Sequence, residues 1–115
     1  MKTALDLSVL ALNQHDLGEV CRILAECVPE YSVCAFGSRV TGKAKPYSDL
    51  DLVVLADQPL TLACMASIKD AFDESDLPIR VDVVDWAATG AAFREIIEQN
   101  YVVIQQGGGA NREKE

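Results

Sequence analysis

Asp49-Leu50-Asp51-Leu52-Val53-Val54-Leu55 places two acids at the start of an apolar run. Apolar side chains follow on both faces of the segment from Leu50 to Leu55, which predicts a strand inside a sheet. Residues two apart on a strand face the same side, so we expect Asp49 and Asp51 to point into one site. This stretch therefore predicts the centre of the fold and the first candidate functional residues together.

Further elements are predicted on both sides of this strand by apolar periodicity and by breakers. Asn13 can cap a helix over residues 13–28, whose apolar side chains recur at helical spacing. The other expected elements are a strand over 31–36, a short helical turn from Ser38, a helix over 62–72, a strand over 79–84, a helix over 89–100 and the apolar segment 101–104. This order predicts an α/β (α+β) fold, a small sheet with flanking helices.

Length and composition predict one globular domain. The chain has 115 residues, of which 50% are hydrophobic and 24% charged, and this balance excludes a disordered or low-complexity protein. We expect the domain to span residues 1–105. Residues 106–115 contain three consecutive glycines and a charged end, and we expect them to form a disordered tail.

Charge and cysteine usage restrict the partners and the compartment. A formal net charge of −8 argues against a surface that coats phosphates, so no direct nucleic-acid binding is expected. No apolar run approaches the roughly 20 residues of a membrane span, and Asp6 interrupts the apolar start, so neither a span nor a secretory signal is expected. Cys21, Cys27, Cys34 and Cys64 lie in apolar segments without CxxC spacing, which predicts reduced, buried thiols in a cytoplasmic protein.

The two acids of the central strand call for a counterion. Carboxylates about 5 Å apart repel by roughly 3 kcal/mol at an effective dielectric constant of 20. A hard divalent cation such as Mg²⁺, which proteins hold through one or two carboxylates plus substrate phosphates, would offset that repulsion. Asp-x-Asp alone also fits two solvated acids at the mouth of a strand.

Two further features strengthen the prediction of a metal and phosphate site. Gly37-Ser38 follows a predicted strand and opens a helical turn, so its backbone N–H groups can face an anion, although an ordinary strand-ending turn also fits. Asp82 is a third carboxylate in an apolar strand, where a salt bridge with a neighbouring Arg is the alternative. Three acids in two strands behind a phosphate-type turn are the arrangement that two-metal nucleotidyl transfer needs.

These residues carry a family resemblance. Gly37-Ser38, ten intervening residues and Asp49-x-Asp51 resemble the signature of the DNA polymerase beta nucleotidyltransferase superfamily. The segments 35–44, 47–52 and 80–86 look like its minimal nucleotidyltransferases, which are commonly paired with a HEPN-domain helical protein. The resemblance extends over about residues 17–104 and implies the polymerase-beta-like nucleotidyltransferase fold, with a mixed sheet.

The resemblance also implies roles for individual residues. Asp49 and Asp51 would hold two Mg²⁺ ions, with Mn²⁺ as an alternative, and Asp82 would hold the catalytic ion and accept the proton of the attacking hydroxyl. Gly37 and Ser38 would bind the phosphates of a nucleoside triphosphate. Arg39 is assigned to the same nucleotide-binding set. The protein then acts by positioning and charge neutralisation.

The function implied is that of a metal-dependent nucleotidyltransferase. It would transfer a nucleoside monophosphate, AMP from ATP, to a hydroxyl of a HEPN-domain toxin, as the antitoxin of a toxin–antitoxin pair. The alternative is a nucleotide-binding or interaction module that neutralises its partner by contact, without catalysis. A third hypothesis is an enzyme that modifies a small molecule, and it is disfavoured because we expect no second domain in a chain of this length.

Other residues near the motifs are weighed but not assigned to the site. Lys43 and Lys45 fit a solvated loop better than a triphosphate site. Asp85, three residues after Asp82, is expected to face the other side of the strand or to lie beyond it. Trp86 fits a packing role, and Tyr47 fits loop packing and base stacking equally.

Overall fold

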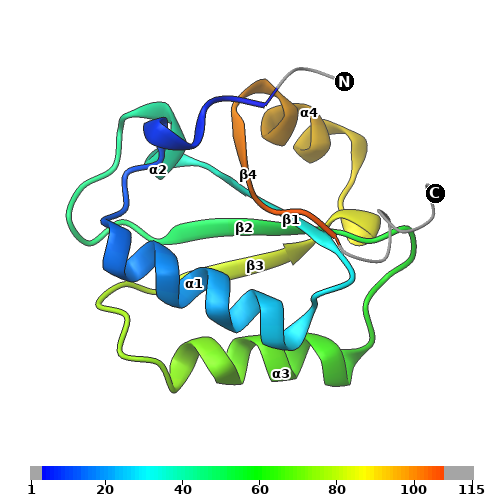
Figure 1. Cartoon of the computed structure of the whole chain (residues 1–115). Coiled ribbons are helices and arrows are strands. Elements are labelled where there is room, and N and C mark those ends of the chain that lie inside the picture. The colour runs from blue at the N-terminus through cyan, green and yellow to red at the C-terminus, as the bar shows by residue number, and fades with distance from the viewer. Residues whose placement is uncertain (1–3, 108–115) are drawn as a thin grey trace.

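A four-stranded mixed sheet forms the centre of the molecule (Figure 1). The computed structural model describes residues 4–107. The strands are β1 (Ser32–Phe36), β2 (Leu50–Leu55), β3 (Val81–Asp85) and β4 (Tyr101–Gln105), in the order β3-β2-β1-β4. β1 pairs antiparallel with β2 and β4, whereas β2 pairs parallel with β3. The expected small mixed sheet with flanking helices is confirmed.

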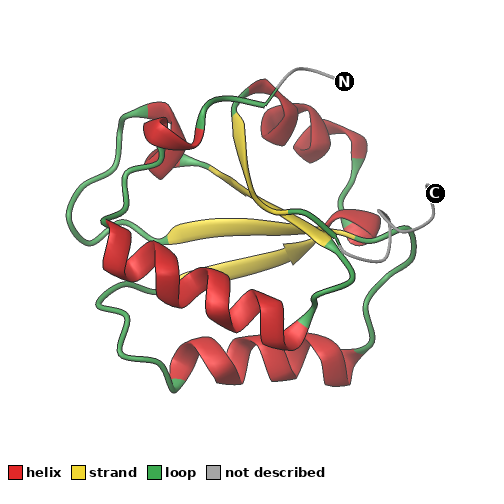
Figure 2. Ribbon diagram, viewed as in Figure 1, coloured by secondary structure: helices red, strands yellow, loops and turns green. Residues whose placement is uncertain are grey.

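Helices cover both faces of this sheet (Figure 2). α1 (Gln14–Cys27) and α3 (Leu62–Asp73) pack together on one face, and α4 (Ala91–Gln99) lies on the other. The short α2 (Ser38–Thr41) follows β1 directly. Two 3-10 turns, η1 (Leu7–Val9) and η2 (Trp86–Ala88), complete the described elements and were not expected from periodicity.

The alternation of β2 divides the core between the two faces. Leu50, Leu52 and Val54 are fully buried against α1 and α3 in the larger cluster. Val53 is fully buried in the smaller cluster, together with Ile97 of α4. Because alternate residues of a strand share a face, Asp51 lies on the same face as Val53, the face that α4 covers.

Element bounds agree with the expectations where the signals are local. Asn13 caps α1, because its side chain accepts a hydrogen bond from the Asp16 amide at 2.8 Å. β2 has the bounds expected for it. β3 begins at Val81, two residues later than expected, and extends to Asp85.

The packed part of the chain extends nearer to the C-terminus than the sequence indicates, as far as Gly107. Residue 106 was expected to begin the tail, but Gly107 is buried and its amide donates to Oγ of Ser32 at 2.9 Å. A Cβ at Gly107 would lie 2.6 Å from the carbonyl oxygen of Glu30, so glycine allows this close approach. The rest of the expected tail, residues 108–115, lies outside the described residues.

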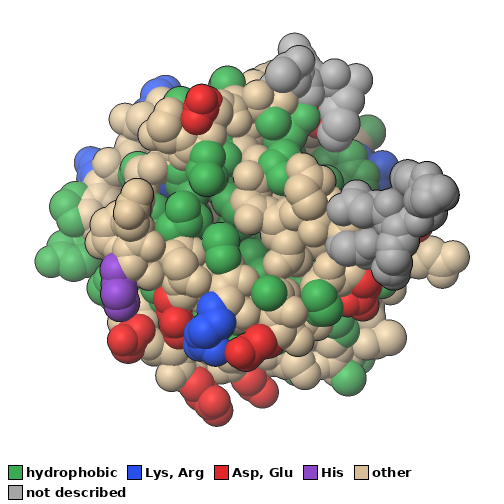
Figure 3. Space-filling model, viewed as in Figure 1, with side chains coloured by type: hydrophobic (Ala, Val, Ile, Leu, Met, Phe, Trp, Pro, Cys, Tyr) green, Lys and Arg blue, Asp and Glu red, His purple; other side chains and the backbone are tan. Residues whose placement is uncertain are grey.

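The cysteines and the charged surface follow the composition. All four cysteines are free, as expected, but only Cys34 is buried and the other three are half-buried. Acidic side chains gather along the lower edge of the molecule in Figure 3, where Arg22 forms ion pairs with Glu19 and Glu26 of the same helix. Across residues 4–107, no helix has the length and apolar character to cross a membrane.

Candidate active site

Asp51 and Asp82 meet on adjacent strands. They are register partners in the parallel pair of β2 and β3, so their side chains point to the same face of the sheet. Asp82 is half-exposed and lies 3.8 Å from the guanidinium of Arg80, two residues before it. Sequence reasoning had weighed a neighbouring Arg only as an alternative to a metal role for Asp82.

Asp49 lies at the N-terminal end of β2, the strand that contains Asp51. It immediately precedes β2 and is half-buried, whereas the ladder begins at Leu50, whose amide donates to the carbonyl of Arg80 at 2.9 Å. Its carboxylate acts electrostatically on Asp51. The structure therefore brings the three predicted acids to one end of the β2–β3 pair.

Burial and like charge act together on Asp51. Burial raises the pKa of this carboxyl above its usual range, and the carboxylates of Asp82 and Asp49 raise the pKa further. The folded protein therefore disfavours the charged form of Asp51 when no cation is bound.

Gly37 lies directly against Asp51. Its φ of 85° lies in the left-handed region, at the junction of β1 and α2. A Cβ at this position would stand 3.2 Å from Cγ of Asp51 and would overlap the carboxylate oxygen Oδ2. The glycine is therefore required both by the backbone conformation and by the close approach of the acid. Ser38 follows it as the first residue of α2 and is half-buried.

The donor chemistry of these acids fits a hard divalent cation. Carboxylate oxygens are the ligands that Mg²⁺ prefers, and the like charges of Asp82 and Asp49 add to burial in raising the pKa of Asp51. In the described part of the chain, no three His, Cys, Asp or Glu side chains already stand close enough to hold an ion. Completion by substrate phosphates is the usual arrangement for Mg²⁺.

Arg39 does not lie where the sequence placed it. Its side chain is only 7% exposed. The guanidinium donates to backbone carbonyls, from Nε to Ser48 at 3.0 Å, from Nη1 to Ala11 at 2.6 Å, and from Nη2 to Pro46 at 3.1 Å. The expectation that Arg39 binds nucleotide does not agree with this geometry, because its donors already have partners. No local signal in the sequence indicated Ala11 as a partner.

Asp85 lies apart from the other acids. Its carboxylate accepts from the amide of Leu60 at 2.7 Å and from the amide of Ala87 at 3.1 Å, so it anchors the segment before α3 and the turn η2. Its exclusion from the site agrees with these contacts.

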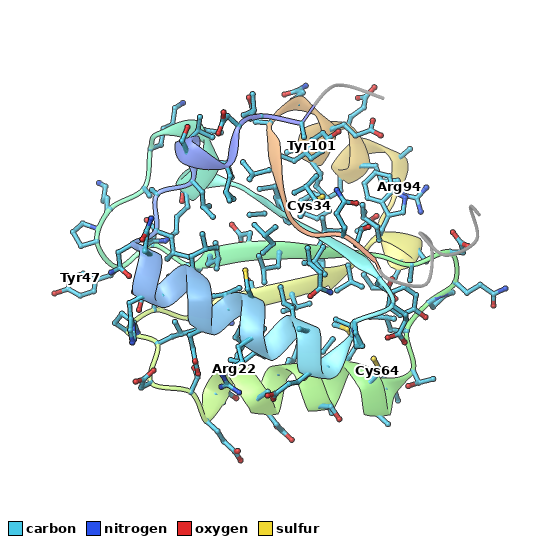
Figure 4. The ribbon with its side chains drawn as sticks, in the orientation of Figure 1. Arg22, Cys34, Tyr47, Cys64, Arg94 and Tyr101 are labelled. Carbon is cyan, nitrogen blue, oxygen red and sulfur yellow. The ribbon has the colours of Figure 1, made fainter. Side chains whose placement is uncertain are left out.

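The two aromatic residues near the motifs, Tyr47 and Trp86, differ in their surroundings. Tyr47 is 88% exposed and points away from the body of the protein, so it does not pack the loop (Figure 4). Trp86 has the guanidinium of Arg94 4.6 Å above its ring, a contact typical of a packing role.

Comparison with known proteins identifies similar chains. Residues 17–106 match the family model described as a nucleotidyltransferase domain. The chain is 54% identical over 97 residues to the probable protein adenylyltransferase MntA of Haemophilus influenzae, a match that covers 84% of this chain and 85% of that protein.

Solved structures share the fold. A toxin–antitoxin crystal structure with AMP-PNP matches with a TM-score of 0.67 at 20% identity, over 84% of this chain and 77% of that chain. A tri-AMPylated HEPN toxin of Shewanella oneidensis in complex with an MNT antitoxin matches with a TM-score of 0.63 at 17% identity, over 88% and 78% of the two chains. At these identities the likeness shows the architecture alone.

Proposed function

Since this chain belongs to the nucleotidyltransferase domain family and is a nucleotidyltransferase, we propose that it transfers AMP from ATP to a hydroxyl of a protein partner. The observation that carries the proposal is the approach of Gly37 to Asp51, with Asp82 beside Asp51 on the next strand. A turn without a side chain and paired carboxylates are what a triphosphate and its cation require.

The residues divide the work of the reaction between them. The turn at Gly37 and Ser38 binds the β- and γ-phosphates through its backbone N–H groups and the Ser38 hydroxyl. Two Mg²⁺ ions, or Mn²⁺ in their place, would neutralise the triphosphate charge. The residues that would hold them are Asp49, Asp51 and Asp82. Asp82, which is half-exposed, takes the proton of the attacking hydroxyl. A bond forms between the acceptor oxygen and the α-phosphorus, the bond to the bridging oxygen breaks, and pyrophosphate leaves.

The proposed partner is a HEPN-domain helical protein, and the chain is its antitoxin. The 54% identical relative is named a probable protein adenylyltransferase, and a structural neighbour is a complex with a tri-AMPylated HEPN toxin. Docking of that partner would place the acceptor hydroxyl beside the α-phosphorus, and such positioning of the two reactants supplies much of the rate enhancement.

Incubation of the full chain with a HEPN-domain protein, ATP and Mg²⁺ tests the proposal by mass spectrometry of the partner. The partner should gain mass in units of AMP, and Asp82→Asn should abolish the gain. Asp57→Asn, an exposed acid outside the site, is the matched control and should behave as wild type.

Neutralisation by contact is the competing outcome. A partner that gains no mass, yet is fully neutralised by the Asp82→Asn variant, would show an interaction module without catalysis. Removal of Mg²⁺ by a chelator should stop mass gain if the cation is required.

A further inference from the structure

Arg39 connects two segments of the site without reaching its centre. It is the second residue of α2, directly after Ser38. All four hydrogen bonds of its guanidinium go to backbone carbonyls, those of Ala11, Lys45, Pro46 and Ser48. A guanidinium has five N–H groups, so at most one is left for any ligand. A residue buried in this way binds its own chain and not a phosphate.

The loop that Arg39 holds leads directly to Asp49. Residues 43–48 have no helix or strand and close on themselves through the Ser48 amide, which donates to the Lys45 carbonyl at 3.0 Å. The Lys45 amide donates in turn to Oγ of Ser48 at 2.8 Å. The bond from Nε of Arg39 to the carbonyl of Ser48 therefore fixes the peptide that joins this loop to Asp49.

The backbone of Arg39 adds a second attachment. Its carbonyl accepts from the Ala11 amide at 2.8 Å, while its Nη1 donates to the Ala11 carbonyl at 2.6 Å. This reciprocal pair holds α2 against the segment that precedes α1. A buried guanidinium is tolerable only when its donors are satisfied, and here the planar fork suits several carbonyls at once.

We propose that Arg39 is a positioning residue, which sets the place of Asp49 relative to the turn at Gly37 and Ser38. The inference rests on the proposed function, because it assigns Arg39 to the metal and phosphate site of that reaction. Asp49 lies outside the β2 ladder, so the bond through Ser48 is the restraint on its N-terminal side. Groups that orient metal ligands commonly change metal affinity about 10- to 100-fold when they are replaced.

Arg39→Lys is the decisive variant, because it keeps the positive charge and removes the planar guanidinium that donates to several carbonyls at once. The full chain should bind Mn²⁺, in calorimetry without nucleotide, about tenfold more weakly than wild type. The amides of Lys45 and Ser48 should exchange faster with solvent while the Leu50 amide keeps its protection. In AMP transfer, kcat should fall while the KM for ATP changes little. Lys43→Met, which removes an exposed charge from the same loop, is the control and should match wild type in all three.

Other outcomes would overturn the inference. If Arg39→Lys behaves as wild type and Arg39→Met raises only the KM for ATP, Arg39 contacts the phosphates as a charge. If both variants lower the melting temperature but leave Mn²⁺ affinity and loop exchange unchanged, Arg39 serves stability alone. If Arg39→Lys does not fold, Ser48→Ala opens the same loop from its other side, and unchanged Mn²⁺ affinity there would contradict the proposal.

Failure of the proposed function is distinguishable from failure of this inference. A wild-type chain that neither binds Mn²⁺ nor transfers AMP would refute the former. Amide exchange at Lys45 and Ser48 would then decide by itself whether Arg39 holds the segment that leads to Asp49.

Discussion

Two glycines of this chain have a positive φ and differ in ψ and in what surrounds them. Gly37 and Gly42 have φ values of 85° and 83°. A Cβ at Gly42 would meet nothing within 4 Å, whereas one at Gly37 would overlap the carboxylate of Asp51. The two positions therefore differ both in backbone conformation, with ψ of −158° at Gly37 and 11° at Gly42, and in the approach to the acid.

Alanine substitution at these two positions should separate the two effects. Gly42→Ala should cost about 1 kcal/mol of stability, because it forces a side chain into the left-handed helical region. Gly37→Ala should cost about 1–3 kcal/mol, because its φ and ψ lie in a region that is open almost to glycine alone. Only Gly37→Ala should weaken metal-dependent ATP binding, because it displaces Asp51. Thermal unfolding and calorimetric titration with Mg·ATP measure the two effects. Equal ATP affinity in both variants would contradict the assigned site.

The ionisation of Asp51 predicts a dependence of stability on pH. Its pKa is raised in the folded state, so the folded protein binds this proton more tightly than the unfolded chain does. Charged Asp51 therefore lowers stability near neutral pH, and this cost disappears as the pH falls through its folded-state pKa.

Asp51→Asn should thus stabilise the metal-free protein at pH 7. We expect a gain of roughly 0.5–1 kcal/mol, since the carboxyl is partly exposed and such charges interact weakly. Melting temperatures in a chelating buffer should show the gain shrinking as the pH falls towards the ordinary range of Asp. Asp57→Asn, an exposed acid, is the control. A gain that grows on acidification would contradict the cause assigned here.

β3 contains two aspartates whose surroundings differ. Asp82 is half-exposed on the face of the site, whereas Asp85 is 8% exposed and bonded to two amides. The odd spacing of three residues places them on different faces, as the period of a strand requires.

Substitution of these two residues by asparagine should give opposite results. Asp85→Asn should destabilise the fold by about 1–3 kcal/mol, because the part-buried amides of Leu60 and Ala87 lose a carboxylate acceptor. It should leave ATP affinity in the folded protein unchanged. Asp82→Asn should do the reverse, with little effect on unfolding and loss of AMP transfer. Denaturant unfolding together with the transfer assay checks both, and a stable Asp85→Asn protein would remove the anchoring role.

Considered as a whole, the molecule leaves apolar side chains exposed beside the site. Phe93 and Ile96 of α4 are 37% and 59% exposed, and the ring of Phe93 packs edge-on against Phe36, the register partner of Asp51. Ile97 of the same helix and Val102 of β4 are buried. The exposed face of α4 thus adjoins the acids of the proposed active site.

Ile96→Glu should weaken association with the HEPN-domain partner at least about tenfold if α4 lies at the contact, since central apolar anchors carry most binding energy. The melting temperature should not change, because the side chain is exposed. Leu62→Glu is the matched control, because Leu62 is 90% exposed at the start of α3. Equal weakening by both variants, measured by calorimetry, would place the contact elsewhere.

The bounds of α1 and β2 were predictable because their causes are local. Asn13 caps the helix through a bond to a residue three positions on, and β2 is specified by an apolar run between two turns. Asp49 and Asp51 were predicted to face one site for a related reason, because spacing along a strand already assigns its residues to a face. The position of Asp82 beside Asp51 depends instead on the pairing of β2 with β3.

Contacts between distant segments could not be predicted in this way. Arg39 was assigned to the nucleotide from its neighbourhood in the motif, yet its hydrogen bond to Ala11 spans 28 positions. Gly107 was assigned to a tail, yet its amide bonds Ser32, 75 positions away. Periodicity, caps and motifs act over a few residues, and so the chain alone specified its elements and its acids. Burial and hydrogen-bond partners depend on which segments the folded sheet brings together, and these assigned Arg39 to the loop before Asp49 and Gly107 to its place against Ser32.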